Sequence, residues 1–145
     1  MVPLNSSSAE SVERLPAGVL AYVGDAVYEL YVRTCLVRDG RRDLEELHRE
    51  AVMRVNAKAQ ARTLAQLDAF LHPDELEIAR RARNAHTGRG PGRGPRGATV
   101  LDYRHSTGFE AVLGYLYLQG REDRLGEVLE KALSLSDENR GGQAP

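Results

Sequence analysis

The strongest constraint on the fold is an apolar segment, residues 15–37, that repeats hydrophobic side chains at three- and four-residue spacings. This spacing is typical of a helix, and Pro16 suits the first turn of one. Further helical runs are expected at about 43–68 (one or two helices), 73–85, 109–119 and 121–135. Residues 86–97 are so rich in glycine and proline that they predict an exposed loop. No alternating strand pattern is present, so the predicted class is all-α.

The chain has 145 residues, a length that suits one domain with its own core. We expect a helical domain over 14–136, between polar tails at 1–13 and 137–145 that we predict to be flexible. No segment has the roughly 20 uninterrupted apolar residues of a membrane helix. The first residues also lack the basic and apolar regions of a secretory signal, so a cytoplasmic location is expected. The lone Cys35 excludes an internal disulfide.

The basic residues are unevenly distributed, although the net charge is only −1. Seven arginines lie within residues 80–104 against the single acid Asp102, whereas 122–138 is acid-rich. A local basic surface on a nearly neutral protein indicates a polyanionic partner held at a defined site. By itself, an arginine-rich loop is more often a solvated segment, so both interpretations stay open.

Two acids, Asp25 and Glu110, interrupt the most apolar helical segments. Burial of a carboxylate is costly, so each is expected to need a compensating partner. Each also lies near a helical glycine, Gly24 or Gly114, which costs about 1 kcal/mol relative to alanine and would be justified by close helix packing. If the two helices cross there, the carboxylates converge on an oxygen site of the kind that Mg²⁺ prefers, which Glu29 could extend.

The alternative is that Asp25 and Glu110 form ion pairs with arginines at the edge of the core, such as Arg33 or Arg104. Spacing alone does not decide between a metal site and these ion pairs.

Four ordered segments resemble the ribonuclease III family, and its Mini-III branch in particular. They are LAYVGDAVYELYVR (20–33), LHREAVMRVNAKAQA (47–61), RRARNAH (80–86) and YRHSTGFEAVLGYLYL (103–118). The resemblance implies an all-helical ribonuclease III domain without an appended double-stranded-RNA-binding domain, and a homodimer. It also implies Mg²⁺-dependent endonucleolytic cleavage of double-stranded RNA to 5′-phosphate and 3′-hydroxyl ends. The implied role is maturation of the precursor of 23S, the large-subunit ribosomal RNA.

The same resemblance places Asp25 on the family's catalytic aspartate, within Gly-Asp-Ala-Val, and Glu110 on its catalytic glutamate, within Phe-Glu-Ala. Two further acids of the full-length ribonuclease III pattern are replaced here by Ala21 and Thr107, as in the Mini-III branch. With two acids per site, one tightly held Mg²⁺ is favoured over two, although the metal count stays open. Glu29 and Thr107 are candidates for a supporting role.

RNA contacts are expected from the basic region, because duplex RNA is recognised largely by its shape and phosphates. The candidate RNA-binding residues are Arg80, Arg81, Arg83, Asn84, His86, Arg89, Arg93, Arg96 and Arg104. The apolar helices, residues 20–32 above all, are expected to form the dimer interface. The alternative function is a catalytically silent ribonuclease III-like module that binds RNA or protein, against which the retention of both acids argues. A helical interaction scaffold would leave the acids and the arginines unexplained.

Overall fold

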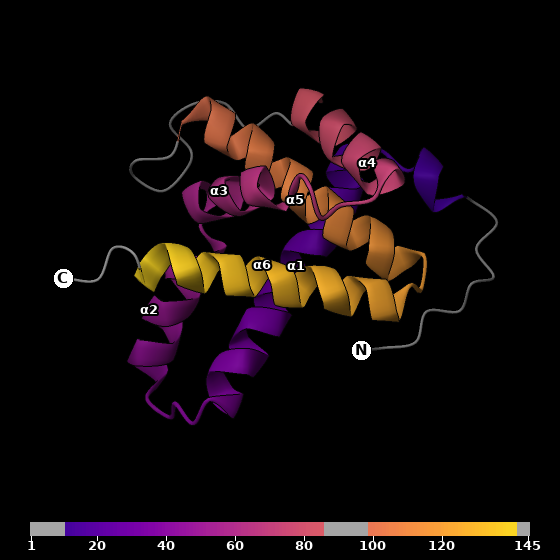
Figure 1. The fold of residues 1–145 in the computed structure, drawn as a ribbon. Coiled ribbons are helices and arrows are strands. Elements are labelled where there is room, and N and C mark those ends of the chain that lie inside the picture. Colours follow the sequence, from indigo (N-terminus) through magenta and orange to yellow (C-terminus); the bar gives the residue numbers. More distant parts are fainter. Residues whose placement is uncertain (1–10, 86–98, 142–145) are drawn as a thin grey trace.

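The computed structural model describes residues 11–85 and 99–141, and in these two stretches all regular structure is helical. Here a short 3-10 helix, η1, precedes six α-helices (Figure 1). The elements are η1 Val12–Arg14, α1 Ala17–Arg38, α2 Leu44–Val55, α3 Ala57–Leu67, α4 Pro73–Asn84, α5 Val100–Leu118 and α6 Glu122–Gly141. The all-α class predicted from the sequence is confirmed. No helix in the described ranges is long and apolar enough to cross a membrane.

Helix α5 is the centre of the fold, because α1, α3, α4 and α6 all pack against it (Figure 1). Its residues from Ser106 to Leu116 are all buried, whichever side of the helix they lie on. A helix surrounded by others has no solvent-facing side, which explains why this segment is apolar all round. The rings of Tyr28 in α1 and Phe109 in α5 pack edge to face, with centroids 4.8 Å apart.

The crossing of α1 and α5 is made possible by two glycines. A Cβ atom added to Gly24 would lie 1.6 Å from the carbonyl oxygen of Glu110. One added to Gly114 would lie 1.9 Å from the carbonyl oxygen of Leu20. Any larger residue would therefore push the two backbones apart, and the close packing predicted from these glycines is confirmed.

Helix α5 begins nine residues earlier than the apolar pattern indicates, at Val100 rather than Phe109. A capping box opens it: the Thr99 side chain accepts the Asp102 N–H, and the Asp102 carboxylate accepts the Thr99 N–H. The Ser106 hydroxyl donates to the buried side chain of Gln60 in α3, which helps to hold this first half in place. Asn56 separates α2 from α3 and caps the latter by accepting the N–H of Ala59.

Helix α6 runs to Gly141, so the boundary expected between the domain and a C-terminal tail at 136/137 falls inside a helix. Ion pairs hold this last part on α2: Arg54 contacts Asp137 at 3.1 Å, and Arg140 contacts Glu50 at 2.8 Å. At the other end, η1 begins within the segment expected to be a tail, residues 1–13, and ends at Arg14. Arg81 of α4 donates to the carbonyl oxygens of Glu13 and Leu15 and fixes η1 there.

Candidate active site

The backbones of Asp25 and Glu110 lie at the point where α1 and α5 cross. Gly24, directly before Asp25, lies against the main chain of Glu110, since the nearest atoms to its added Cβ are the Glu110 carbonyl group. Gly114, one turn after Glu110, lies against α1 in turn: its added Cβ would be 1.9 Å from the carbonyl oxygen of Leu20 and 3.1 Å from the backbone nitrogen of Gly24. The two helices are held together by backbone-to-backbone packing, so the two acids start from a fixed relative position.

The two acids differ in burial. Glu110 is buried, with 7% of its surface exposed, and it interacts with a neighbouring group. Asp25 is exposed, although it interrupts an apolar segment and the sequence indicates burial. The reason is that this part of α1 is not covered by another helix, since Tyr22 and Ala26 are exposed as well.

Neither of the arginines named above as possible partners forms an ion pair with Asp25 in the described ranges. Arg33 pairs with Glu29, one turn away on α1, at 2.7 Å. Within the described ranges Asp25 is in no ion pair, and neither is Arg104. Glu29 is therefore engaged by Arg33 next to Asp25, and Thr107 donates its hydroxyl hydrogen to the carbonyl oxygen of Tyr103.

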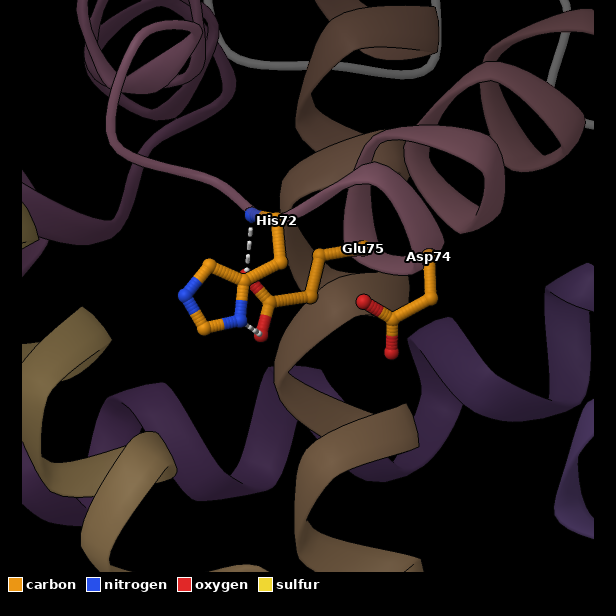
Figure 2. Close-up of side chains that lie close together, drawn as sticks. All are labelled: His72, Asp74 and Glu75. Atoms are coloured by element: carbon orange, nitrogen blue, oxygen red, sulfur yellow. Dashed lines mark hydrogen bonds and ion pairs between the residues drawn. The ribbon is translucent and has the colours of Figure 1, made fainter.

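A second group of possible metal ligands lies at the start of α4 and consists of His72, Asp74 and Glu75 (Figure 2). One potential ligand atom from each residue falls within 4.8 Å of the others. In Figure 2 the His72 ring lies beside the Glu75 carboxylate, and dashed lines join Glu75 to the backbone and the ring of His72. The sequence reasoning did not single out this group, because these acids occur in an ordinary polar first turn of a helix.

Both carboxylates of this second group already accept hydrogen bonds from arginines. Glu75 has no exposed surface, and its two oxygens accept from Arg124 at 2.7 and 2.9 Å. Asp74 accepts from Arg121 at 3.0 Å and from the Tyr115 hydroxyl at 3.1 Å. Burial alone would raise the pKa of Glu75, but the hydrogen bonds from Arg124 and the His72 backbone outweigh it and lower the pKa. Glu75 and Arg124 thus form a buried ion pair that joins α4 to α6, whereas His72 and Asp74 are exposed, and two guanidinium groups oppose a cation there.

The candidate RNA-binding residues within the described ranges have different surroundings. Arg80 is exposed and pairs with Glu77 at 2.6 Å, whereas Arg81 is committed to η1. Arg104 and Asn84 are exposed, and Arg83 is half-buried near His105. Burial, followed by the nearby charge of Arg83, lowers the pKa of His105. His86, Arg89, Arg93 and Arg96 lie outside the described residues.

Helix α1 also exposes large apolar side chains, and one of them, Tyr22, lies one turn before Asp25. Tyr22 is 81% exposed, and the other exposed apolar side chains of this helix are Val19, Leu30 and Val37. The spacing of Val19, Tyr22 and Leu30 places them along one stripe, with Asp25 and Ala26 between Tyr22 and Leu30. We call Val19, Tyr22, Ala26 and Leu30 the α1 stripe. Large exposed apolar surfaces mark interaction sites.

Comparison with known proteins gives concordant results. The ribonuclease III domain family matches residues 18–121. The Mini-ribonuclease 3 of Thermoanaerobacter sp. (strain X514) is 43% identical over 129 residues, which are 89% of this chain and 88% of that protein. The Mini-ribonuclease 3 of Symbiobacterium thermophilum is 47% identical over 118 residues, 81% of this chain and 88% of its own length. The crystal structure of protein FN1578 from Fusobacterium nucleatum superposes with a TM-score of 0.73 at 26% identity, over 87% of this chain and 98% of that one.

Proposed function

The chain belongs to the ribonuclease III family and is a metal-dependent endoribonuclease of its Mini-III branch; we propose that it uses Mg²⁺ held by Asp25 and Glu110 to cleave double-stranded RNA. The observation that carries the proposal is the glycine crossing of α1 and α5, which brings the backbones of these two acids together. Carboxylate oxygens are the ligands that Mg²⁺ takes, with waters and substrate phosphate completing its shell. Asp25 also lacks an ion pair with any other described residue, so its charge is available to a cation.

The residues divide the work as follows. When bound, Mg²⁺ supplies a charge that activates a water for in-line attack on phosphorus and stabilises the leaving 3′-oxygen. Asp25 and Glu110 supply ligand oxygens from two helices whose packing leaves no room for relative movement. The buried position of Glu110 reduces the screening of its charge by water, whereas exposed Asp25 leaves the site open to a phosphate of the duplex. The products would carry 5′-phosphate and 3′-hydroxyl ends.

A homodimer is part of the proposal, and the α1 stripe supports it. This stripe lies on the same helix as Asp25 and would be covered by its counterpart in a second copy. A two-fold axis there would bring two catalytic sites to one duplex, so that one binding event cuts both strands.

Sedimentation of the wild type and of Leu30→Glu at micromolar concentration tests the dimer; Val52→Glu is a control that changes an exposed apolar residue on α2. We expect a dimer for the wild type and the control, and a monomer for Leu30→Glu. A monomeric wild type would refute this part.

The natural substrate is proposed to be the precursor of 23S ribosomal RNA, in the cytoplasm. Contacts with the RNA would come from Arg83, Arg104 and Asn84. The adjoining basic segment would add His86, Arg89, Arg93 and Arg96. Arg80 and Arg81 also belong to the proposed surface, but they are engaged by Glu77 and by η1.

The deciding experiment is incubation of the purified chain with a long RNA duplex, with and without Mg²⁺, followed by mapping of the product ends. We expect Mg²⁺-dependent cuts on both strands with 5′-phosphate ends, and no cutting of the same sequence as a single strand. An intact duplex in the presence of Mg²⁺ would favour the catalytically silent binding module instead.

A further inference from the structure

A cavity of about 250 Å³ lies between the end of α2, the first turns of α3 and the last turns of α6. Its lining includes three cationic side chains, Lys58, Arg62 and Arg140, and no acid. Neither α1 nor α5 contributes to it, so it is separate from Asp25 and Glu110. We call it the α3–α6 cavity.

The nearby acids do not neutralise all of this charge. Glu50 accepts from Arg54 and Arg140, and Asp137 accepts from Arg54. Lys58 and Arg62, one turn apart on α3, are in no ion pair with another described residue. Two positive groups therefore remain available on one side of the cavity, next to a third that is only partly compensated.

The polar frame of the cavity is rigid. Asn56 caps α3 through its side-chain oxygen and donates its amide hydrogens to the carbonyl groups of Val52 and Met53. Asn139 and Gln66 exchange two hydrogen bonds, of 2.8 and 3.2 Å, between α6 and α3. These side chains therefore hold the wall in place.

One largely buried side chain in the wall is polar. Ser136 is only 4% exposed and lines the cavity, and its hydroxyl forms no hydrogen bond with another described residue. This hydroxyl can therefore donate to a group that enters the cavity. The cavity also adjoins the positive end of the α3 dipole, where anions are stabilised.

We propose that the α3–α6 cavity binds a phosphate group, and that this phosphate belongs to the RNA backbone away from the bond that is cut. Lys58 and Arg62 provide charged donors, and Ser136 provides a neutral one. An anion with several acceptor oxygens satisfies all three at once, and the arginine fork suits phosphate geometry. The RNA assignment rests on the proposed function, which makes a polyphosphate strand the substrate. The cavity then extends the contact with duplex RNA beyond the catalytic crossing.

Duplex binding measured without metal, so that nothing is cut, tests the RNA assignment. Lys58→Ala/Arg62→Ala is compared with Arg49→Ala/Lys131→Ala, which removes the same charge from exposed positions outside the cavity. We expect the slope of log affinity against log salt to fall by roughly two for the cavity variant, because each lost phosphate contact removes about one unit. Equal slopes and affinities for the two variants would overturn the assignment.

Pyrophosphate tests the cavity itself, by titration into the metal-free chain with the amide signals of Lys58 and Ala59 followed by NMR. We expect saturable shifts in the wild type, affinity several-fold weaker in Ser136→Ala, which keeps the net charge, and no shifts in Lys58→Ala/Arg62→Ala. Absence of shifts in the wild type, or shifts that all three proteins share, would overturn the cavity as a phosphate site. A chain that binds duplex RNA through the cavity but cuts none would refute the proposed function and leave this inference standing.

Discussion

The glycine crossing and the start of α4 both gather acids, but their surroundings differ. At the crossing, Asp25 is exposed and no described residue forms an ion pair with it. At the start of α4, Glu75 is fully buried and Arg124 holds both of its oxygens, while Arg121 contacts Asp74. Proximity of ligand atoms is thus a poor guide to a metal site when guanidinium groups already neutralise the carboxylates. The first region is suited to catalysis and the second to stability.

The largest expected effect separates the two regions by activity. Asp25→Asn and Glu110→Gln should each lower the cleavage rate at least about a hundredfold, because metal charge stabilisation contributes several kcal/mol and each 1.4 kcal/mol is tenfold. Asp74→Asn, which alters the α4 group, should stay within a few-fold of the wild type. Single-turnover cleavage of a duplex, with circular dichroism as a check on folding, measures this. Near-normal turnover by either crossing variant would place the metal elsewhere.

The second effect is on stability, and here the start of α4 should matter. Glu75→Gln removes the buried counter-charge of Arg124 and leaves only the exposed Glu127, and removal of one partner of a buried pair costs about 3–5 kcal/mol. Urea unfolding should show this loss, and Glu75→Met/Arg124→Met should be less destabilised than the single variant. If Glu75→Gln unfolded at the wild-type midpoint, the pair would not hold α4 on α6.

The third effect tests the crossing as a packing feature. Gly24→Ala forces a Cβ into the Glu110 carbonyl, so we expect a loss of about 3 kcal/mol, the upper part of the usual range for overpacking. Gly126→Ala is the control: its Cβ would meet nothing within 4 Å, and the change should stabilise α6 by up to about 1 kcal/mol. Equal midpoints for the two variants in urea would show that the helices can separate there at little cost.

Sequence and structure agree where the signal is local and differ where partners are distant. Gly24, next to Asp25, and Gly114, one turn after Glu110, predicted the crossing. A glycine inside a helix lowers its stability, so its presence there indicates that another helix packs closely against it. The first half of α5 was missed because Ser106 and Gly108 are poor helix formers, held here by contacts with α3 and α4. The signal that could have found it is the Thr99–Asp102 capping box.

Two features of the site could not be predicted from local pattern. The exposure of Asp25 was missed, because an apolar stripe that covers a core and one that awaits a partner have the same spacing. The Glu75–Arg124 pair joins residues far apart in the sequence, and no local pattern in either helix indicates its partner in the other.

The smallest effect concerns the ion pairs between α2 and α6, which should affect the pH dependence of the unfolding free energy but not catalysis. Hydrogen bonds from Arg54, and then from Arg140, lower the pKa of Glu50 from 4.5 to about 2. Since the folded pKa is the lower one, the stabilisation is complete above pH 4.5 and is lost as the pH falls towards 2. Glu50→Gln should therefore flatten the fall in unfolding free energy across this window, whereas Glu45→Gln, exposed on the same helix, should not. Parallel curves for both variants would contradict the role of Glu50.

The most direct test of the central claim is to locate the metal with Mn²⁺, a paramagnetic substitute for Mg²⁺, by relaxation of backbone amide signals. We predict that Mn²⁺ selectively broadens the signals of Gly24, Asp25 and Ala111, and that Asp25→Asn removes the effect. Broadening centred on His72 and Glu75, with sharp signals at the crossing, would contradict the assignment of Asp25 and Glu110 as the metal ligands.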